Sequence, residues 1–190
     1  ARYVARLHGV VFDTDWSLLG GVFLDAPTLG ADLSRNVGDA AVRVEAIWTD
    51  PERKVQHFGE PAPREVDDFW QVVVSIDTNL DYGSGVYVLF EHLYNGNALG
   101  FGRGLAGPLL PLFASPGVAV SPDRFGTSQV VSGAEQQSGL MLGYDLTPEL
   151  RGDFLTLADW NGGSAVLFPM LRWSPVGSLE LSLGAQIGLG

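Results

Sequence analysis

The 190-residue chain has no cysteine, few basic residues and no long apolar run. The absence of cysteine excludes disulfide bridges, thiol chemistry and cysteine-ligated zinc. Lysine and arginine number 11 against 22 aspartates and glutamates, which gives a formal net charge of −11. A nucleic-acid-binding protein needs a basic surface to neutralise phosphates, so nucleic acid is not expected as a partner. No run of about 18 apolar residues occurs, so no transmembrane helix is expected.

What the sequence does contain is alternation of apolar and polar residues, which is the period of a β-strand. In the last segment, Leu181, Leu183 and Ile187 share one parity, whereas Ser182 and Gln186 share the other. Helical periodicity is hard to find, and the sequence therefore predicts an all-β protein. The nine predicted strands, the second of them broken near its proline, are 2–12, 16–33, 39–49, 69–79, 85–95, 135–147, 151–160, 164–174 and 179–189.

The connections between these segments are of two kinds. The tight turns, rich in turn-forming residues, are 34–38, 80–84, 146–150 and 174–178. At the other end lie the longer connections 50–68 and 96–134 and the short links 13–15 and 161–163. Short turns at one end and longer loops at the other are typical of outer-membrane barrels. We therefore predict one domain over 1–190, a transmembrane antiparallel up-and-down β-barrel with 96–134 as its long outer loop.

Aromatic residues fit this topology, because Trp and Tyr prefer the headgroup level of a membrane. On the apolar parity, those predicted at the outer strand ends are Trp16, Trp48, Trp70, Tyr94 and Trp160, and those predicted at the inner ends are Tyr144 and Trp173. We interpret the seven as two aromatic girdles. The core of a soluble sandwich would instead scatter such residues along its strands.

Alternation alone does not say which face of a sheet is inside. In a soluble sandwich or a lipocalin-like barrel the apolar parity would point inward and the charges would face water. Strand length separates the two readings. Segments of about nine to eleven residues suit a tilted membrane crossing, whereas soluble strands average about five or six. The sequence therefore favours the membrane barrel.

Five segments, 39–49, 85–96, 139–150, 164–174 and 179–190, resemble the C-terminal part of Gram-negative outer-membrane porin-like barrels. The resemblance covers most of the chain except 96–134. It implies a location in the bacterial outer membrane, in contact with lipid and lipopolysaccharide, and a passive or scaffold role, but no substrate. Such barrels typically end on an aromatic residue, whereas this chain ends on Gly190.

The strand count bears on completeness. With nine strands, the first and the last run in the same direction and cannot close by antiparallel pairing. An unpaired edge in lipid would leave backbone groups unsatisfied at several kcal/mol each. Either 179–189 pairs in parallel with 2–12, as in rare barrels, or its neighbour lies outside this chain. We expect the latter, so that the chain is a piece of a larger barrel.

The polar parity supplies the candidate pore-lining residues, namely Arg43, Glu45, Gln71, Asp77, Glu91, Asp145, Arg172, Glu180 and Gln186. In a water-filled lumen such a mixed ring selects solutes by charge. The alternative is that these side chains pair across strands and hold the wall together. The predicted function is a porin-like channel for passive diffusion of small polar or ionic solutes. The rival hypotheses are a structural barrel that sheathes or anchors a partner protein, and a soluble ligand-binding barrel.

The remaining motifs predict neither catalysis nor cofactor binding. None of His8, His57 and His92 is spaced to converge with a serine and an acid, so no enzyme is expected. The acidic pairs at 13–15 and 66–68 have too few ligands for calcium, and no metal or other cofactor is expected. The apolar segment 100–117, inside 96–134, would fold into the pore, pack against a partner or lipid, or form a short capped helix that covers the rim. Oligomerisation stays open.

Overall fold

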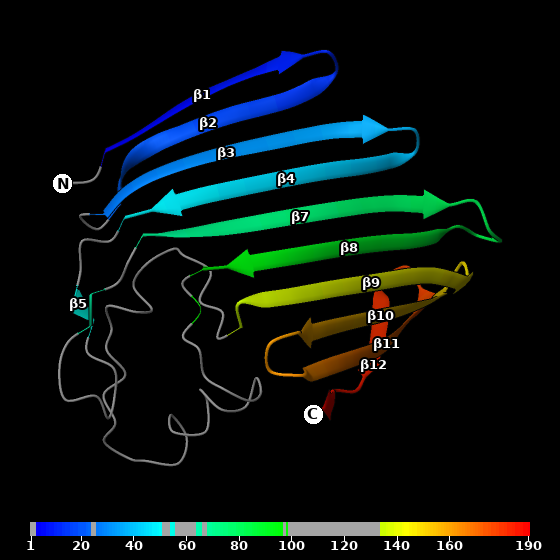
Figure 1. Ribbon diagram of the computed structural model, residues 1–190. Helices are drawn as coiled ribbons and strands as arrows, with labels where there is room; N and C mark the ends of the chain where they lie inside the picture. Colours follow the sequence, from blue (N-terminus) through cyan, green and yellow to red (C-terminus); the bar gives the residue numbers. More distant parts are fainter. Residues whose placement is uncertain are drawn as a thin grey trace.

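The computed structural model describes residues 3–23, 26–50, 54–55, 64–65, 68–96, 98 and 134–190. The described residues form an antiparallel sheet in which strands follow one another in chain order (Figure 1). Its strands are β1 (Tyr3–Val11), β2 (Thr14–Phe23), β3 (Ala26–Val37), β4 (Ala40–Thr49), β7 (Phe69–Leu80), β8 (Val86–Asn95), β9 (Gln136–Thr147), β10 (Leu150–Asp159), β11 (Ser164–Val176), β12 (Leu179–Gly184) and β13 (Ile187–Leu189). A separate small ladder joins β5 (Lys54–Val55) and β6 (Arg64–Glu65).

The all-β, up-and-down antiparallel topology is confirmed, but the sheet is not closed. Among the described strands, β1 pairs only with β2, and β12 and β13 pair only with β11. The two outer rows of the sheet therefore both have a free edge. A closed barrel is not what the structure shows.

The predicted number of strands was wrong by one. The segment 16–33 contains two strands, because β2 ends at Phe23 and β3 begins at Ala26, with direct pairing between these two residues. The sequence pattern predicts a proline break within a single strand here, and that prediction was wrong. The sheet therefore has ten rows, and its first and last rows run in opposite directions. The directions of these two rows therefore permit antiparallel pairing between them.

The last row of the sheet consists of β12 and β13, and both strands pair with β11 in the same register. Gly184 pairs with Met170 and Ile187 pairs with Leu167 on the neighbouring strand β11. Between these pairs the amide of Ala185 donates to the carbonyl of Pro169 at 3.1 Å. Because proline has no N–H, the reciprocal bond cannot form and the ladder is interrupted there.

The turns at 12–13, 38–39, 81–85, 148–149 and 177–178 lie at one end of the sheet, which we call the tight-turn end, and the opposite end is the long-loop end (Figure 1). The turn of Phe12 and Asp13 lies at the tight-turn end, because Thr14 pairs with both Val11 and Arg35. Its two residues have positive φ angles of 49° and 57°, as a two-residue hairpin turn requires. The link 13–15 had been predicted at the other end, an error that follows from the strand missed in 16–33.

The sheet has an apolar face and a polar face, each formed by alternate residues of the paired strands. On the apolar face Val42, Ile76, Phe90 and Leu140 form one continuous row across four strands. In the described strands Arg35 is the single Lys, Arg, Asp or Glu residue on this face. The charged side chains of the sheet thus belong almost entirely to the polar face.

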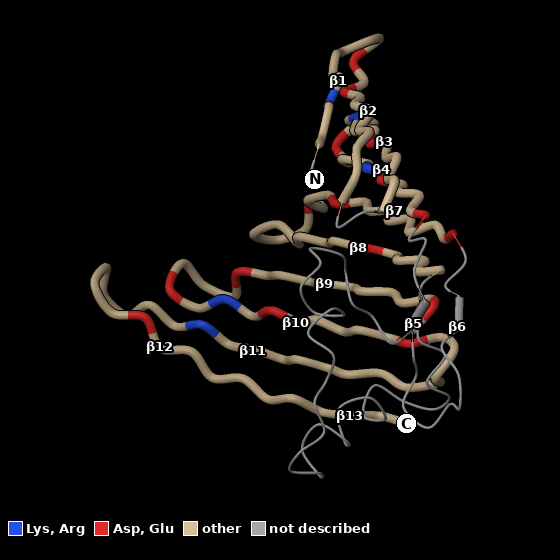
Figure 2. The backbone as a smooth tube through the Cα atoms, turned by 90° about the vertical axis from the view of Figure 1, so that its left-hand side faces the viewer, with Lys and Arg blue, Asp and Glu red and all other residues tan. Residues whose placement is uncertain are grey.

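The two faces also differ in exposure. The buried polar side chains all lie on the polar face, and they are Ser17, Thr28, Thr49, Gln71, Ser75, Asn95, Asp153 and Asp159. On the apolar face large side chains stay exposed, among them Leu33 at 50 % and Leu183 at 74 %. Figure 2 shows that the sheet bends, so that β8–β12 turn out of the plane of β1–β7. Side chains converge on the concave side of a bent sheet and diverge on its convex side, so the polar face is the concave one.

Candidate functional site on the polar face

The strand register places the predicted pore-lining residues of the strands on the polar face. They come from six strands and are Arg43, Glu45, Gln71, Asp77, Glu91, Asp145, Arg172 and Glu180. The ninth, Gln186, lies in the interruption between β12 and β13. The residues therefore share one surface, and their role in a pore remains a prediction.

A cluster of two arginines and one aspartate holds β10 and β11 together at the tight-turn end. Arg151 and Arg172 are direct cross-strand neighbours. Arg172 donates to Asp153 Oδ2 from Nη2 at 2.6 Å and from Nε at 3.0 Å, and Arg151 Nε donates to Asp153 Oδ1 at 2.9 Å. The Asp153 side chain is only 4 % exposed. One buried carboxylate thus separates two guanidinium groups that would otherwise repel each other.

The cluster continues to β9. Arg151 Nη1 donates to Asp145 Oδ1 at 3.3 Å. Gly143 pairs directly with Asp153 and is buried beneath it. A Cβ atom at Gly143 would collide with the Arg151 guanidinium and lie 3.1 Å from Asp153 Oδ1. Because Gly143 has no side chain, the Arg151 guanidinium and the Asp153 carboxylate can meet above it.

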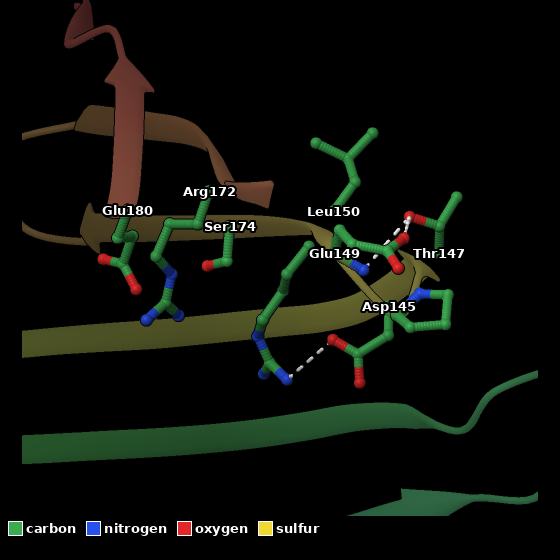
Figure 3. Close-up of a pocket in the computed structure, with 9 residues that line it drawn as sticks. Asp145, Thr147, Glu149, Leu150, Arg172, Ser174 and Glu180 are labelled. Carbon is green, nitrogen blue, oxygen red and sulfur yellow. Dashed lines mark hydrogen bonds and ion pairs between the residues drawn. The ribbon is translucent and has the colours of Figure 1, made fainter. Parts of the chain in front are cut away.

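An open hollow lies beside this cluster, with Glu180 and Asp145 at its two sides (Figure 3). Arg172, Ser174 and Glu180 point to the same side of the sheet, whereas Leu150 points to the other. The lining residues are Asp145, Thr147, Pro148, Glu149, Leu150, Arg151, Arg172, Ser174 and Glu180. The hollow is lined by charges of both signs, and the basic segments of β10 and β11 lie at the tight-turn end (Figure 2).

Two smaller ion-pair clusters lie on the N-terminal half of the polar face. Arg43 Nη1 donates to Asp77 Oδ1 at 2.7 Å, which joins β4 to β7. Arg6 donates to Ser17 Oγ at 3.1 Å and to Asp32 Oδ2 at 3.4 Å, and the Ser17 hydroxyl also donates to Asp32. This second cluster joins β1, β2 and β3.

The charges on the polar face are therefore only partly paired. In the described strands its arginines are Arg6, Arg43, Arg151 and Arg172, and its acidic residues are Asp15, Asp32, Glu45, Asp77, Glu91, Asp145, Asp153, Asp159 and Glu180. Each arginine forms an ion pair with an aspartate. Among the described residues, no arginine or lysine pairs with the carboxylates of Glu45, Glu91 or Glu180.

The concave face is not polar throughout. Leu89, Met141, Leu155 and Phe168 form a directly paired row across β8, β9, β10 and β11. All four are partly buried. The alternation of 151–160 was unclear in the sequence because Leu155 and Leu157 share the parity of Asp153. The polar face thus combines an apolar row near its middle with charged clusters toward its ends.

Gln71, one of the predicted pore-lining residues, is buried and bonds to a neighbouring strand instead of facing open solvent. Gln71 Nε2 donates to Asn95 Oδ1 at 3.0 Å, and both side chains are buried at the long-loop end. The pair joins β7 to β8. This arrangement matches the alternative that polar side chains on this face hold neighbouring strands together.

The seven predicted girdle residues all lie on the apolar face. Trp48, Trp70, Tyr94 and Trp160 are at the long-loop end, and Tyr144 and Trp173 are at the tight-turn end. Trp16 is also at the tight-turn end, because it pairs with Gly9 beside the Phe12–Asp13 turn, so the predicted outer position was wrong. Its indole ring lies over Gly9, where a Cβ would be 3.0 Å from the ring. Whether the seven mark a membrane boundary stays a prediction.

A short polar row interrupts the apolar face at the long-loop end. Trp160 Nε1 donates to Ser138 Oγ at 2.9 Å, and His92 Nδ1 lies 2.9 Å from the same oxygen. Because the indole N–H can only donate, the serine hydroxyl is free to donate to His92. Among the described residues no carboxylate bonds to His92, so this is not a catalytic triad.

Other predictions concern residues that the structure describes only in part or not at all. His57, the segment 100–117 and most of the loop 96–134 lie outside the described residues. Within the described part of the chain, no three His, Asp or Glu side chains are arranged to hold a metal ion. The expectation that the protein is not an enzyme stays a prediction.

Comparison with known protein families, with curated proteins and with solved structures found no match. In the described residues, no helix is long and apolar enough to cross a membrane.

Proposed function

We propose that this chain forms the wall of an outer-membrane β-barrel channel, along whose polar face small polar or ionic solutes diffuse passively. The observation that carries the proposal is the separation of the faces. Large apolar side chains stay exposed on the convex face, where Arg35 is the single charged residue of the described strands. Contiguous apolar surfaces of this extent are rare on soluble monomers, whereas lipid solvates them.

The dimensions of the strands support the same proposal. From β1 to β11 the strands of the large sheet contain 9 to 13 residues. A tilted strand needs about 9 to 11 residues to cross the hydrocarbon core. Within the sheet, ladder pairing satisfies the backbone groups as lipid requires. In a membrane the free edges of β1 and of the β12–β13 row must also be paired, and their opposite directions permit antiparallel pairing.

A direct test uses two adjacent residues in the middle of β8. Phe90 lies on the apolar face and is 40 % exposed, whereas Glu91 lies on the polar face. At the midplane of a bilayer, Phe90→Arg should lower the free energy of unfolding by about 2–4 kcal/mol, while Glu91→Arg should have a small effect on stability. Urea unfolding in lipid vesicles measures both. The reverse order of effects would show that the apolar face does not meet lipid.

Two further measurements test the channel itself. Purified protein reconstituted into a planar bilayer should give stepwise ion conductance. A protein that dissolves as a monomer without detergent would contradict the membrane location. Insertion into vesicles without any conductance would contradict the channel while leaving the barrel wall in place.

The apolar row on the concave face favours a second candidate function. Leu89, Met141, Leu155 and Phe168 would suit contact with a partner protein or an apolar ligand better than contact with water. In that case the barrel would sheathe or anchor a partner, and the intact complex would not conduct. Conductance measured before and after removal of co-purifying protein separates the two functions.

A further inference from the structure

Resting on the channel function proposed above, the geometry points to a cation-preferring path in which Glu45 and Glu91 determine the preference. The polar face of the described strands carries nine acidic side chains and four arginines, a difference of five negative charges. All four arginines are paired with aspartates at distances from 2.6 to 3.4 Å. The charges left without an opposite partner are therefore all negative.

Paired and unpaired charges act on a passing ion over different ranges. The field of a close ion pair is dipolar and falls off quickly with distance. An unpaired carboxylate acts over about 8–10 Å at physiological ionic strength, which is the Debye length. The arginines on this face consequently contribute little attraction for anions, while the unpaired glutamates attract cations.

Glu45 and Glu91 are placed where they matter to an ion that crosses the whole wall. Each lies near the middle of its strand, β4 and β8 respectively, and each side chain is exposed. Glu91 pairs across the ladder with Ser75 and Gly139. Neither residue offers a positive charge, and the glycine has no side chain to cover the carboxylate. Glu180, the third unpaired glutamate, lies at the tight-turn end, where it acts on entry only.

The cross-strand neighbours of Glu45 leave its carboxylate without a positive partner. It lies directly opposite Asp32 of β3 and Val73 of β7. Asp32 accepts hydrogen bonds from Ser17 and from Arg6, and Val73 is apolar, so neither cross-strand neighbour offers a positive charge to Glu45.

The test is the reversal potential of the reconstituted protein in a KCl gradient. The unaltered protein should give a K⁺ to Cl⁻ permeability ratio above unity, and Glu45→Gln with Glu91→Gln should lower this ratio by about twofold or more. Arg43→Gln, which leaves Asp77 unpaired, should raise it. Asp13→Asn removes one negative charge from the Phe12–Asp13 turn, where asparagine tolerates the φ of 57°, and should leave the ratio unchanged.

The outcomes separate this inference from the proposed function. Conductance with a ratio at or below unity overturns the cation preference and leaves the channel intact. A ratio above unity that survives the double substitution overturns the role of Glu45 and Glu91. Absence of any conductance overturns the channel and the inference together. Strand content by circular dichroism confirms that each variant has folded before its ratio is compared.

Discussion

Two charge clusters on the polar face both join neighbouring strands, but they are built differently. Arg43 and Asp77 form a single pair whose side chains are 48 % and 22 % exposed. In the other cluster Asp153 is 4 % exposed and is shared by Arg151 and Arg172. Water can replace the missing partner of an exposed pair, whereas it cannot reach a buried carboxylate between two cations. A cross-strand ion pair on this face can therefore be either incidental or structural.

The largest effect is expected from removing the shared carboxylate. Asp153→Ala would leave Arg151 and Arg172 facing each other across β10 and β11 with no anion between them. Breaking a buried ion pair costs about 3–5 kcal/mol. Because the two arginines are 35 % and 36 % exposed, we expect a smaller loss of about 2 kcal/mol in the free energy of unfolding. Urea unfolding in detergent micelles measures it, and a loss no larger than that of Arg43→Gln would contradict the distinction.

An intermediate effect is expected from filling the space beneath the buried cluster. Gly143→Ala would push the Arg151 guanidinium away from Asp153 and weaken a charge-assisted hydrogen bond, at a cost of about 1 kcal/mol. Gly139→Ala on the same strand is the matched control, since its Cβ would lie 3.3 Å from one Leu157 methyl group. Both variants replace glycine by alanine in β9, so the change in intrinsic β propensity is the same. Equal unfolding free energies for the two variants would show that the ion pairs do not depend on Gly143.

The smallest effect is expected at the exposed pair. Arg43→Gln removes an ion pair that is largely hydrated, and such pairs contribute about 0–1 kcal/mol. We expect a change below about 0.5 kcal/mol in unfolding free energy, although the same variant should shift ion selectivity. Unfolding measured at low and at high salt checks this, because salt weakens only exposed pairs. A loss comparable to that of Asp153→Ala would mean that the pair is shielded from water.

The faces of the sheet could be predicted because side-chain alternation is a local property. Leu181 and Leu183 are two residues apart, so any strand that contains them places both side chains on the same face. The aromatic residues were assigned to the correct face for the same reason. The end of the sheet at which each aromatic residue lies can be predicted only if every turn before it is counted. Trp16 was assigned to the wrong end because the two-residue connection between β2 and β3 was missed.

The buried ion-pair cluster could not be predicted from alternation. Asp153 lies in a strand whose polar parity also carries Leu155 and Leu157, so the sequence signal there is weak. Its partner Arg172 is on the next strand, and only the register brings the two together. Arg172 and Asp145 were selected singly, but Asp153 and Arg151, which link them, were not. Long-range pairing is a property of the folded sheet rather than of any short segment.

Pro169 has a consequence for how the sheet comes apart. The final strand row has one neighbour only, and at the level of Ala185 that neighbour donates no hydrogen bond in return. The row therefore divides into two short halves that can detach one after the other, without the whole strand peeling away at once. Pro169 thus marks the level at which the pairing of the last row with β11 is weakest.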